Sequence, residues 1–313
     1  MTHAPAASTP QPAGPIGPVA ALRLAMADIK LAHTVFALPF AVLAAALAVA
    51  PGTPTPTLAA VFGLVLLCMV LARTWAMLVN RLADARFDAE NPRTAQRAVA
   101  AGRLGRRQGW AIAATAAALF CAAAALFIPA AQNPWPLWLC LPVLGFIALY
   151  SYTKRFTALC HLFLGAALAL SPVAAAIAVR PDALADTPAV WWLAGYVLAW
   201  VAGFDVIYAL QDLDFDRGRG LKSIPAALGW RGAVWTSRAL HAAAIAALVT
   251  ASLADDRLGP VFAVGVAAAA ALLVTEHLVL IRRGARGIPM AFFTLNGIVS
   301  LVLGAAGLAD LAL

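Results

Sequence analysis

Long apolar runs separated by short polar segments dominate the hydrophobic pattern of the chain. Most runs are long enough for a helix to cross the roughly 30 Å of hydrocarbon in a bilayer. The runs lie at about residues 31–50, 58–80, 110–130, 137–152, 158–179, 190–211, 233–253, 259–281 and 289–312. A membrane β-barrel is excluded, because its strands would alternate polar and apolar residues. The pattern therefore predicts an all-α, polytopic membrane protein with nine transmembrane helices.

The amino-acid composition agrees with a membrane protein. Of the 313 residues, 63% are hydrophobic and 12% are charged, which is about half the charged fraction of a soluble protein. Residues 1–18 are mainly Ala, Pro, Thr and Gly, so we expect a disordered N-terminal tail rather than a signal peptide. Residues 19–313 are expected to form a single membrane domain. The four cysteines lie within or beside apolar runs, which favours small buried side chains over a redox or metal site.

Positive charge is concentrated in alternate connections between the runs. The connections after the second, fourth, sixth and eighth runs carry most of the Lys and Arg, whereas residues 51–57 and 131–136 carry no charge. By the positive-inside rule, the N-terminus and the basic connections face the cytoplasm, and the C-terminus lies outside the inner membrane. Topology and the ligands of these connections thus explain the net charge of +8, and we expect no nucleic-acid partner.

Two acidic segments stand at the cytoplasmic ends of the second and sixth runs. They read NRLADARFDAENPRTAQR (80–97) and DVIYALQDLDFDRGRGLKSIP (205–225). Carboxylates are costly in and near a bilayer, so two such clusters indicate a functional site. Carboxylates that face each other also repel unless cations lie between them.

The two acidic segments repeat at a fixed distance along the chain. Asp84 and Asp88 precede Asp212 and Asp216 by the same 128 residues, and the runs that carry them are four apart in order. This regularity predicts a duplicated half in the same orientation, with one site shared between the copies. The predicted pseudo-repeats extend over about residues 23–155 and 156–285 and are followed by a last helix.

The spacing within each acidic segment predicts a polar stripe, because residues four apart share one face of a helix. One stripe contains Arg73, Asn80, Asp84 and Asp88, and the other contains Asp205, Tyr208, Asp212 and Asp216. If the stripes face each other, their oxygen ligands suit Mg²⁺ better than zinc or copper. The expected metal ligands are Asn80, Asp84, Asp88, Asp212 and Asp216.

Basic residues accompany the acids and extend the predicted chemistry. Magnesium held by few carboxylates usually takes its remaining ligands from water and phosphate, and neighbouring cations would bind the outer phosphate oxygens. These cations are Arg93, Arg97, Lys154 and Lys222. The predicted ligand is therefore a magnesium-bridged diphosphate whose apolar part lies among the helices, which describes an isoprenoid diphosphate.

Four segments together resemble the intramembrane aromatic prenyltransferases of the UbiA superfamily, and the resemblance covers nearly the whole chain. The segments are LAHTVFALPF (31–40), 80–97, YSYTKRFT (150–157) and 205–225. The resemblance implies nine helices around a central cavity and transfer of polyprenyl groups from diphosphates to aromatic acids, with Mg²⁺ at the two acidic motifs. The first motif of the family often reads Asn-Asp, whereas this chain has Asn80-Arg81.

The resemblance also implies roles for individual residues. Asp84, Asp88, Asp212 and Asp216 match the acidic motifs and are the expected catalytic residues. Lys154 or Arg155 is a candidate for binding the acceptor carboxylate or the diphosphate. Other candidates for substrate contacts are His33, Arg73, Asn80, Arg93, Arg97, Tyr208, Lys222 and Ser223.

Two charged residues lie deeper in the membrane than the motifs. Arg73 either pairs with Asp205 or a neighbour, or it contacts substrate. Asp205 either stabilises the carbocation, accepts the proton of the acceptor, or serves as the partner of Arg73. His161, His241 and the adjacent Glu276 and His277 are expected to form hydrogen bonds between helices.

The predicted activity is magnesium-dependent transfer of a polyprenyl group to the ring of an aromatic acid in quinone biosynthesis, with 4-hydroxybenzoate as the first choice. The same chemistry on 1,4-dihydroxy-6-naphthoate, or on another acceptor such as haem, is the alternative. A cation-coupled transporter is the competing class. Transporters usually bind their ions near the bilayer midplane, whereas these acidic clusters lie at its edge.

Overall fold

The computed structural model describes residues 16–29 and 36–313, and every regular element in these ranges is helical. The elements are α1 (Pro18–Ile29), α2 (Leu38–Leu47), α3 (Thr55–Ala83), α4 (Ala85–Glu90), α5 (Arg106–Ala125), α6 (Phe127–Ala131), α7 (Trp135–Thr153), α8 (Cys160–Val179), α9 (Ala183–Asp186), α10 (Ala189–Ala209), the 3₁₀ turn η2 (Leu210–Asp212), α11 (Leu213–Gly218), α12 (Ile224–Ala254), α13 (Pro260–Arg283), the 3₁₀ turn η3 (Gly284–Gly287), the π-helix η4 (Met290–Leu295) and α14 (Asn296–Ala312). Most of the predicted N-terminal tail and the candidate His33 lie outside the described residues.

The prediction of an all-helical, polytopic membrane protein is confirmed. Eight helical stretches within the described residues are long and apolar enough to cross a bilayer. The first predicted run appears as α2, which has ten helical residues and is buried against α8. The count of nine spans is therefore not confirmed, although eight of the nine predicted runs match a span-length helical stretch.

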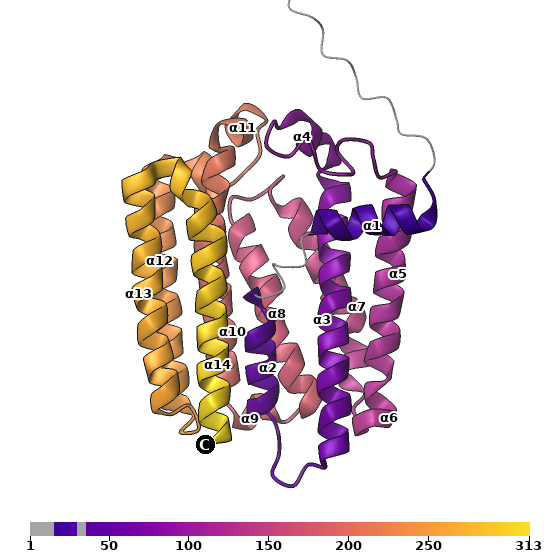
Figure 1. The fold of residues 1–313 in the computed structure, drawn as a ribbon, viewed down its shortest axis with the longest axis vertical. Helices are drawn as coiled ribbons and strands as arrows, with labels where there is room; N and C mark the ends of the chain where they lie inside the picture. Colours follow the sequence, from indigo (N-terminus) through magenta and orange to yellow (C-terminus); the bar gives the residue numbers. More distant parts are fainter. Residues whose placement is uncertain (1–15, 30–35) are drawn as a thin grey trace, which may run out of the picture.

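The long helices form one bundle in which α10 has a central position. In Figure 1, α12, α13 and α14 lie on one side, α3, α5 and α7 lie on the other, and α8, α10 and α2 lie between them. In the helical stretch Ala189–Gly218, 78% of the residues of the most apolar part are buried inside the bundle. Close packing depends on glycine, since a Cβ at Gly165 of α8 would lie 2.3 Å from the carbonyl oxygen of Leu198.

Helix α1 was not predicted, because its twelve residues form no run long enough to span a bilayer. It crosses the bundle near the ends of α3 and α5, close to α4 (Figure 1). Its buried residues Ala21, Ala25 and Ile29 follow a four-residue spacing and pack against Leu78 and Leu82 of α3. The helix therefore covers one side of the first acidic motif.

The regular helix is interrupted in both acidic motifs, at Asp84 in the first and just before Asp212 in the second. Asp84, between α3 and α4, has φ −92° and ψ 6°, and Asp212, before α11, has φ −106° and ψ 8°. These values lie in the sparsely populated bridge region. The predicted polar stripes therefore do not lie along single continuous helices. Instead, each motif ends in a six-residue helix, and α4 and α11 lie at the same end of the bundle (Figure 1).

Candidate functional site

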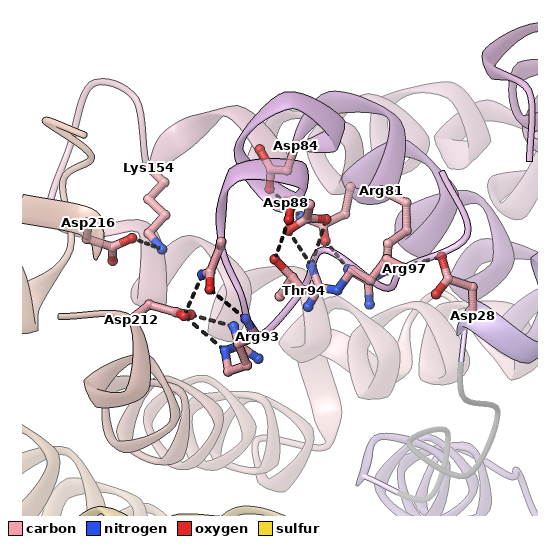
Figure 2. A network of polar contacts seen from close by, with 12 residues as sticks. Asp28, Arg81, Asp84, Asp88, Arg93, Thr94, Arg97, Lys154, Asp212 and Asp216 are labelled. Carbon is pink, nitrogen blue, oxygen red and sulfur yellow. Dashed lines mark hydrogen bonds and ion pairs between the residues drawn. The ribbon is translucent and has the colours of Figure 1, made fainter. Parts of the chain in front are cut away.

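The two acidic motifs and the connection between α7 and α8 enclose a cavity at this end of the bundle. Its volume is about 90 Å³. The charged residues that line it are Asp84, Asp88, Arg93, Arg97, Lys154, Arg155, Asp212 and Asp216. Figure 2 shows that most of these charges are directed toward one another and not into the solvent. The fold thus brings together segments that are more than a hundred residues apart in the sequence.

Asp212 of the second motif is bound by the loop that follows the first motif. Asn91 Nδ2 donates to Asp212 Oδ1 at 2.8 Å, and Arg93 Nε donates to the same oxygen at 2.9 Å. Arg93 Nη2 donates to Asp212 Oδ2, so the guanidinium binds the carboxylate with two parallel hydrogen bonds. The Arg93 backbone N–H donates to Asn91 Oδ1 at 3.0 Å, and this turn directs both side chains across the cavity.

Asp216 is the most deeply buried carboxylate of the site, with a side chain that is 1% exposed. Lys154 Nζ lies 2.8 Å from its Oδ1, and Ser223 Oγ donates to its Oδ2 at 3.0 Å. Ser223 also caps α12 by accepting the Ala226 N–H. Burial lowers the pKa of Lys154, but the charge and hydrogen bond of Asp216, together with the charge of Asp212, outweigh this effect. The pKa of Lys154 is therefore raised, and the ammonium group stays charged.

The first motif is held less tightly than the second. Arg97 Nη1 lies 2.8 Å from both oxygens of Asp88. The Asp84 side chain is 28% exposed, and its Oδ1 accepts from Arg155 Nη2 at 3.3 Å. Burial and then the nearby Asp88 raise the pKa of Asp84 more than the Arg155 guanidinium lowers it. The contact of Asp84 with its cation is the longest of the four ion pairs that line the cavity.

Two consecutive cations in the connection between α7 and α8 join the two motifs. Lys154 binds Asp216, and Arg155 binds both Asp84 and the carbonyl oxygen of Ala83, the latter at 2.8 Å. Lys222, in contrast, donates from Nζ to the carbonyl oxygen of Phe156 and does not line the cavity. Lys154 and Arg155 thus occupy the centre of the charge network.

Asn80 and Arg81 lie beside the cavity instead of lining it. Asn80 Oδ1 accepts from Arg81 Nη1 at 2.8 Å, and Asn80 Nδ2 donates to Asp84 Oδ2 at 3.2 Å. Arg81 also lies 3.8 Å from Asp28 of α1, as Figure 2 shows. Sequence reasoning missed Asp28, which no motif contains. Arg81, which follows Asn80 where the resembled motif often has Asp, thus contributes a positive charge that connects α3 to α1.

Asp205 has a partner that the sequence did not identify. His161 Nδ1 lies 2.6 Å from Asp205 Oδ2. Among the described residues Asp205 forms its ion pair with His161 and not with Arg73, whose Nε is buried without a hydrogen-bond partner. The alternative in which Arg73 pairs with Asp205 is therefore wrong for this structure. Tyr208 accepts a hydrogen bond from Arg93 Nη1 at 2.8 Å, so it too belongs to the network around Asp212.

The other buried polar residues connect helices, as predicted. His241 Nδ1 of α12 lies 3.1 Å from His277 Nε2 of α13, and Asn296 Nδ2 of α14 donates to Glu276 Oε2 at 3.2 Å. Both contacts lie in the part of the bundle formed by α10 and α12 to α14 and apart from the cavity. They stabilise packing between helices and contribute nothing to the charge network of the motifs.

The donor types at the cavity fit Mg²⁺, because carboxylate and amide oxygens are the ligands that this ion prefers. In the described ranges, however, His, Cys, Asp and Glu side chains form no group of three arranged to hold a metal. Each carboxylate is instead paired with an arginine or lysine. Metal binding would therefore require these cations to exchange their carboxylate partners for other anions.

Comparison with known proteins identifies sequences similar to most of the chain. The model of the UbiA prenyltransferase family matches residues 37–298. The 4-hydroxybenzoate octaprenyltransferase of Aromatoleum aromaticum is 32% identical over 237 residues, which are 75% of this chain and 76% of that protein. The enzyme of the same name from Alcanivorax borkumensis is 34% identical over 174 residues, so the matched part spans about half of each protein, 55% and 56%.

Solved structures share the fold. A UbiA homolog from Aeropyrum pernix K1 superimposes with a TM-score of 0.78 at 35% identity, covering 90% of this chain and 98% of that one. A UbiA homolog from Archaeoglobus fulgidus, solved with DMAPP and Mg²⁺, has a TM-score of 0.65 at 20% identity, covering 94% and 99%.

Proposed function

The chain belongs to the UbiA prenyltransferase family, and we propose that it transfers a polyprenyl group from a polyprenyl diphosphate to the ring of 4-hydroxybenzoate. The observation that supports this proposal most is the position of Lys154 and Arg155. These consecutive cations join the two acidic motifs across one cavity, which is the arrangement that a metal-bridged diphosphate needs.

The charges of the cavity support a diphosphate ligand. Its four aspartates are matched by four cations, Arg93, Arg97, Lys154 and Arg155. In the proposed complex, Asp84, Asp88, Asp212 and Asp216 hold Mg²⁺, which when bound stabilises the negative charge of the departing diphosphate. Arg93, Arg97 and Lys154 would then turn from the carboxylates to phosphate oxygens, to which they would donate charge-assisted hydrogen bonds. The charge of the bound Mg²⁺ would offset most of the charge of the diphosphate, so the net charge of the site would change little.

The choice of acceptor rests on the names of the relatives and on the residues beside the cavity. Both matched relatives are named 4-hydroxybenzoate octaprenyltransferases. Arg155 is about one third exposed and has only a weak contact with Asp84, so we propose that it binds the carboxylate of the acceptor. A 1,4-dihydroxy-6-naphthoate carries the same carboxylate and remains the second candidate.

A direct assay tests this function. Membranes that contain the protein are incubated with Mg²⁺, a labelled polyprenyl diphosphate and either 4-hydroxybenzoate or 1,4-dihydroxy-6-naphthoate. We expect labelled prenylated 4-hydroxybenzoate. Product with the naphthoate alone would move the protein to menaquinone synthesis. If the protein binds the labelled diphosphate but neither acid is prenylated, the acceptor assignment is wrong.

We also propose that the end of the bundle with α4 and α11 faces the cytoplasm. The basic connections cluster at this end, and the C-terminus lies at the opposite end (Figure 1). Two exposed positions at opposite ends, Arg103 and Asp256, provide a matched pair of cysteine variants. A membrane-impermeant maleimide should label Asp256→Cys and not Arg103→Cys in intact spheroplasts. The reverse pattern would invert the topology.

The shared break at Asp84 and Asp212 also supports our proposal that the chain contains two parallel pseudo-repeats. The helices α4 and α11 follow these residues at the same 128-residue offset, 213 − 85 = 128. Equivalent substitutions test the proposal: Asp84→Asn and Asp212→Asn should both lower activity, and loss of activity in only one of them would contradict the shared role of the repeats.

A further inference from the structure

We propose that His161 is a positioning residue that holds the carboxylate of Asp205 oriented to accept the ring proton of the aromatic substrate. The proposal rests on the proposed function and adds to it a residue that belongs to neither acidic motif. His161 lies in the first turn of α8, Asp205 lies on α10, and the residue that completes the arrangement, Ile224, begins α12. Three helices therefore converge at this contact.

The contact between His161 and Asp205 is short and sheltered. His161 Nδ1 lies 2.6 Å from Asp205 Oδ2, and the imidazole side chain is 2% exposed. The Asp205 side chain is 21% exposed. One carboxylate oxygen is thus fixed by a buried partner while the side chain as a whole keeps an open face. A base that must receive a proton from a substrate needs this combination of support and access.

A backbone hydrogen bond determines which imidazole nitrogen carries the proton. The Ile224 N–H donates to His161 Nε2 at 3.3 Å. This N–H belongs to the first turn of α12, where backbone donors have no partner within the helix. Because Nε2 accepts, the ring proton lies on Nδ1 and is donated to Asp205. The positive end of the α12 dipole also disfavours a second proton on the ring.

The position of Asp205 on α10 places its open face below the charge network. Asp205 and Tyr208 are partly exposed, whereas Phe204, Val206 and Ile207 are buried. The two exposed residues are one helical turn apart and so share a face. Tyr208 accepts a hydrogen bond from Arg93, which binds Asp212.

This arrangement orders the site along the helix. Asp205 lies roughly 10 Å deeper than Asp212, at about 1.5 Å per residue. A diphosphate bound beside Arg93 would therefore direct its first prenyl carbon toward the level of Asp205. The aromatic ring that attacks this carbon would lie at the same depth, next to the carboxylate.

The proposed step balances without another reactant. The bond between the first prenyl carbon and the diphosphate oxygen breaks, and its electron pair leaves with the diphosphate. A ring carbon of the phenol forms the new carbon–carbon bond. The proton on that ring carbon moves to Asp205, and the electron pair of the broken C–H bond restores aromaticity. Asp205 later releases the proton to water. His161 donates one hydrogen bond throughout and is itself neither protonated nor deprotonated.

Four variants of the full-length protein in membranes test the proposal. Asp205→Asn removes the base and should lower kcat roughly 100-fold or more. His161→Phe keeps a buried ring without the donor and should lower kcat roughly 10- to 100-fold, the value of a hydrogen bond to a charged group. His161→Asn retains an amide donor near the position of Nδ1 and should recover part of this loss. The double variant His161→Phe/Asp205→Asn should be no slower than Asp205→Asn alone, because His161 acts only through Asp205.

A ring-deuterated acceptor distinguishes positioning from a general loss of structure. If His161 supports the base, proton loss becomes slower in His161→Phe, and an isotope effect that is small in the wild type should increase. The KM for the diphosphate should stay unchanged. An unchanged isotope effect together with a lower kcat, or an additive double variant, would overturn the proposal.

The same assay separates this proposal from the proposed function. If the wild-type protein prenylates no aromatic acid, the proposed function fails and the question of the base does not arise. If the wild type is active and His161→Phe retains full kcat, only the role of His161 is wrong. Thermal unfolding of each variant in detergent identifies a folding defect, and His161→Asn then provides the test with a polar side chain at the buried position.

Discussion

The two acidic motifs share a backbone and differ in how firmly their carboxylates are held. In both, the regular helix breaks next to an aspartate, Asp84 or Asp212, and a six-residue helix follows. The Asp212 side chain is 10% exposed and binds both Asn91 and Arg93. The Asp84 side chain is 28% exposed, and its contact with Arg155 is long. The comparison shows that equal spacing does not produce equal halves. The second motif is the more firmly held anchor of the site, because the loop after the first motif binds its Asp212. The first motif is more open to solvent at Asp84.

The largest expected effect is loss of activity on removal of one charge from either motif. Asp212→Asn and Asp84→Asn should each lower kcat/KM by about 10²- to 10³-fold, since both carboxylates are proposed to stabilise the bound metal and diphosphate. Asp214 lies within the second motif but is exposed, so Asp214→Asn is the matched control and should change activity less than about twofold. Steady-state prenylation measures all three. Equal losses for Asp212→Asn and Asp214→Asn would contradict the site.

The difference in burial predicts unequal effects on stability at the two cations that join the motifs. Lys154→Gln leaves the buried Asp216 without its ionic partner and should lower the free energy of unfolding by about 3 kcal/mol. Arg155→Gln breaks a pair that is about one third exposed and should cost less than about 1 kcal/mol. Thermal or denaturant unfolding in detergent compares the two. If Arg155→Gln is the more destabilising variant, the description of the second motif as the anchor is wrong.

A milder change tests the geometry by which the first loop holds the second motif. Arg93→Lys keeps the charge but loses the two parallel bonds to Asp212 and the contact with Tyr208. We expect roughly a 10-fold increase in the KM for the diphosphate, which corresponds to about one lost charge-assisted hydrogen bond. Arg86 of α4 has an exposed side chain, so Arg86→Lys is the matched control and should leave the KM for the diphosphate unchanged. An Arg93→Lys variant with normal KM would mean that charge alone is needed.

The smallest effect is expected at the margin of the first motif. Asp28 and Arg81 are 3.8 Å apart, beyond hydrogen-bond distance, and Arg81 keeps its hydrogen bond to Asn80. Asp28→Asn, which keeps a polar side chain of the same size, should therefore lower the free energy of unfolding by less than about 1 kcal/mol although the pair is largely buried. The measurement is again thermal unfolding, with kcat as the control. A large loss of kcat at unchanged stability would show that α1 contributes to the site directly, and that the first motif is more constrained than its exposure indicates.

Helical architecture and the types of residue at the site were predictable because both depend on local pattern. Span-length apolar runs determine where helices can lie, and the acidic residues stand out against them. The same local reasoning failed at Asp84 and Asp212, where four-residue spacing suggested an unbroken helix although the backbone turns toward the cavity. Periodicity reports which residues share a face only while the helix continues.

Partner choice was not predictable, since it is determined by packing between distant segments. Asn91 and Arg93 reach an aspartate that lies 121 and 119 residues later. His161 and Asp205 are 44 residues apart on different helices, and the donor that sets the tautomer belongs to a third helix. The sequence predicted only that His161 would form a hydrogen bond between helices, because a polar residue in an apolar run needs a partner.

The adjacency of Lys154 and Arg155 has a consequence for insertions and deletions. Neighbouring residues are 3.8 Å apart at their Cα atoms in any trans peptide, so a single peptide unit fixes the relative register of two motifs that are 128 residues apart in sequence. Additional residues elsewhere in the long loops can be absorbed by the surface. One extra residue between Lys154 and Arg155 cannot be absorbed in this way, because one of the two side chains would lose its carboxylate partner. The chain is therefore most intolerant of length changes at a connection that contains no acidic residue.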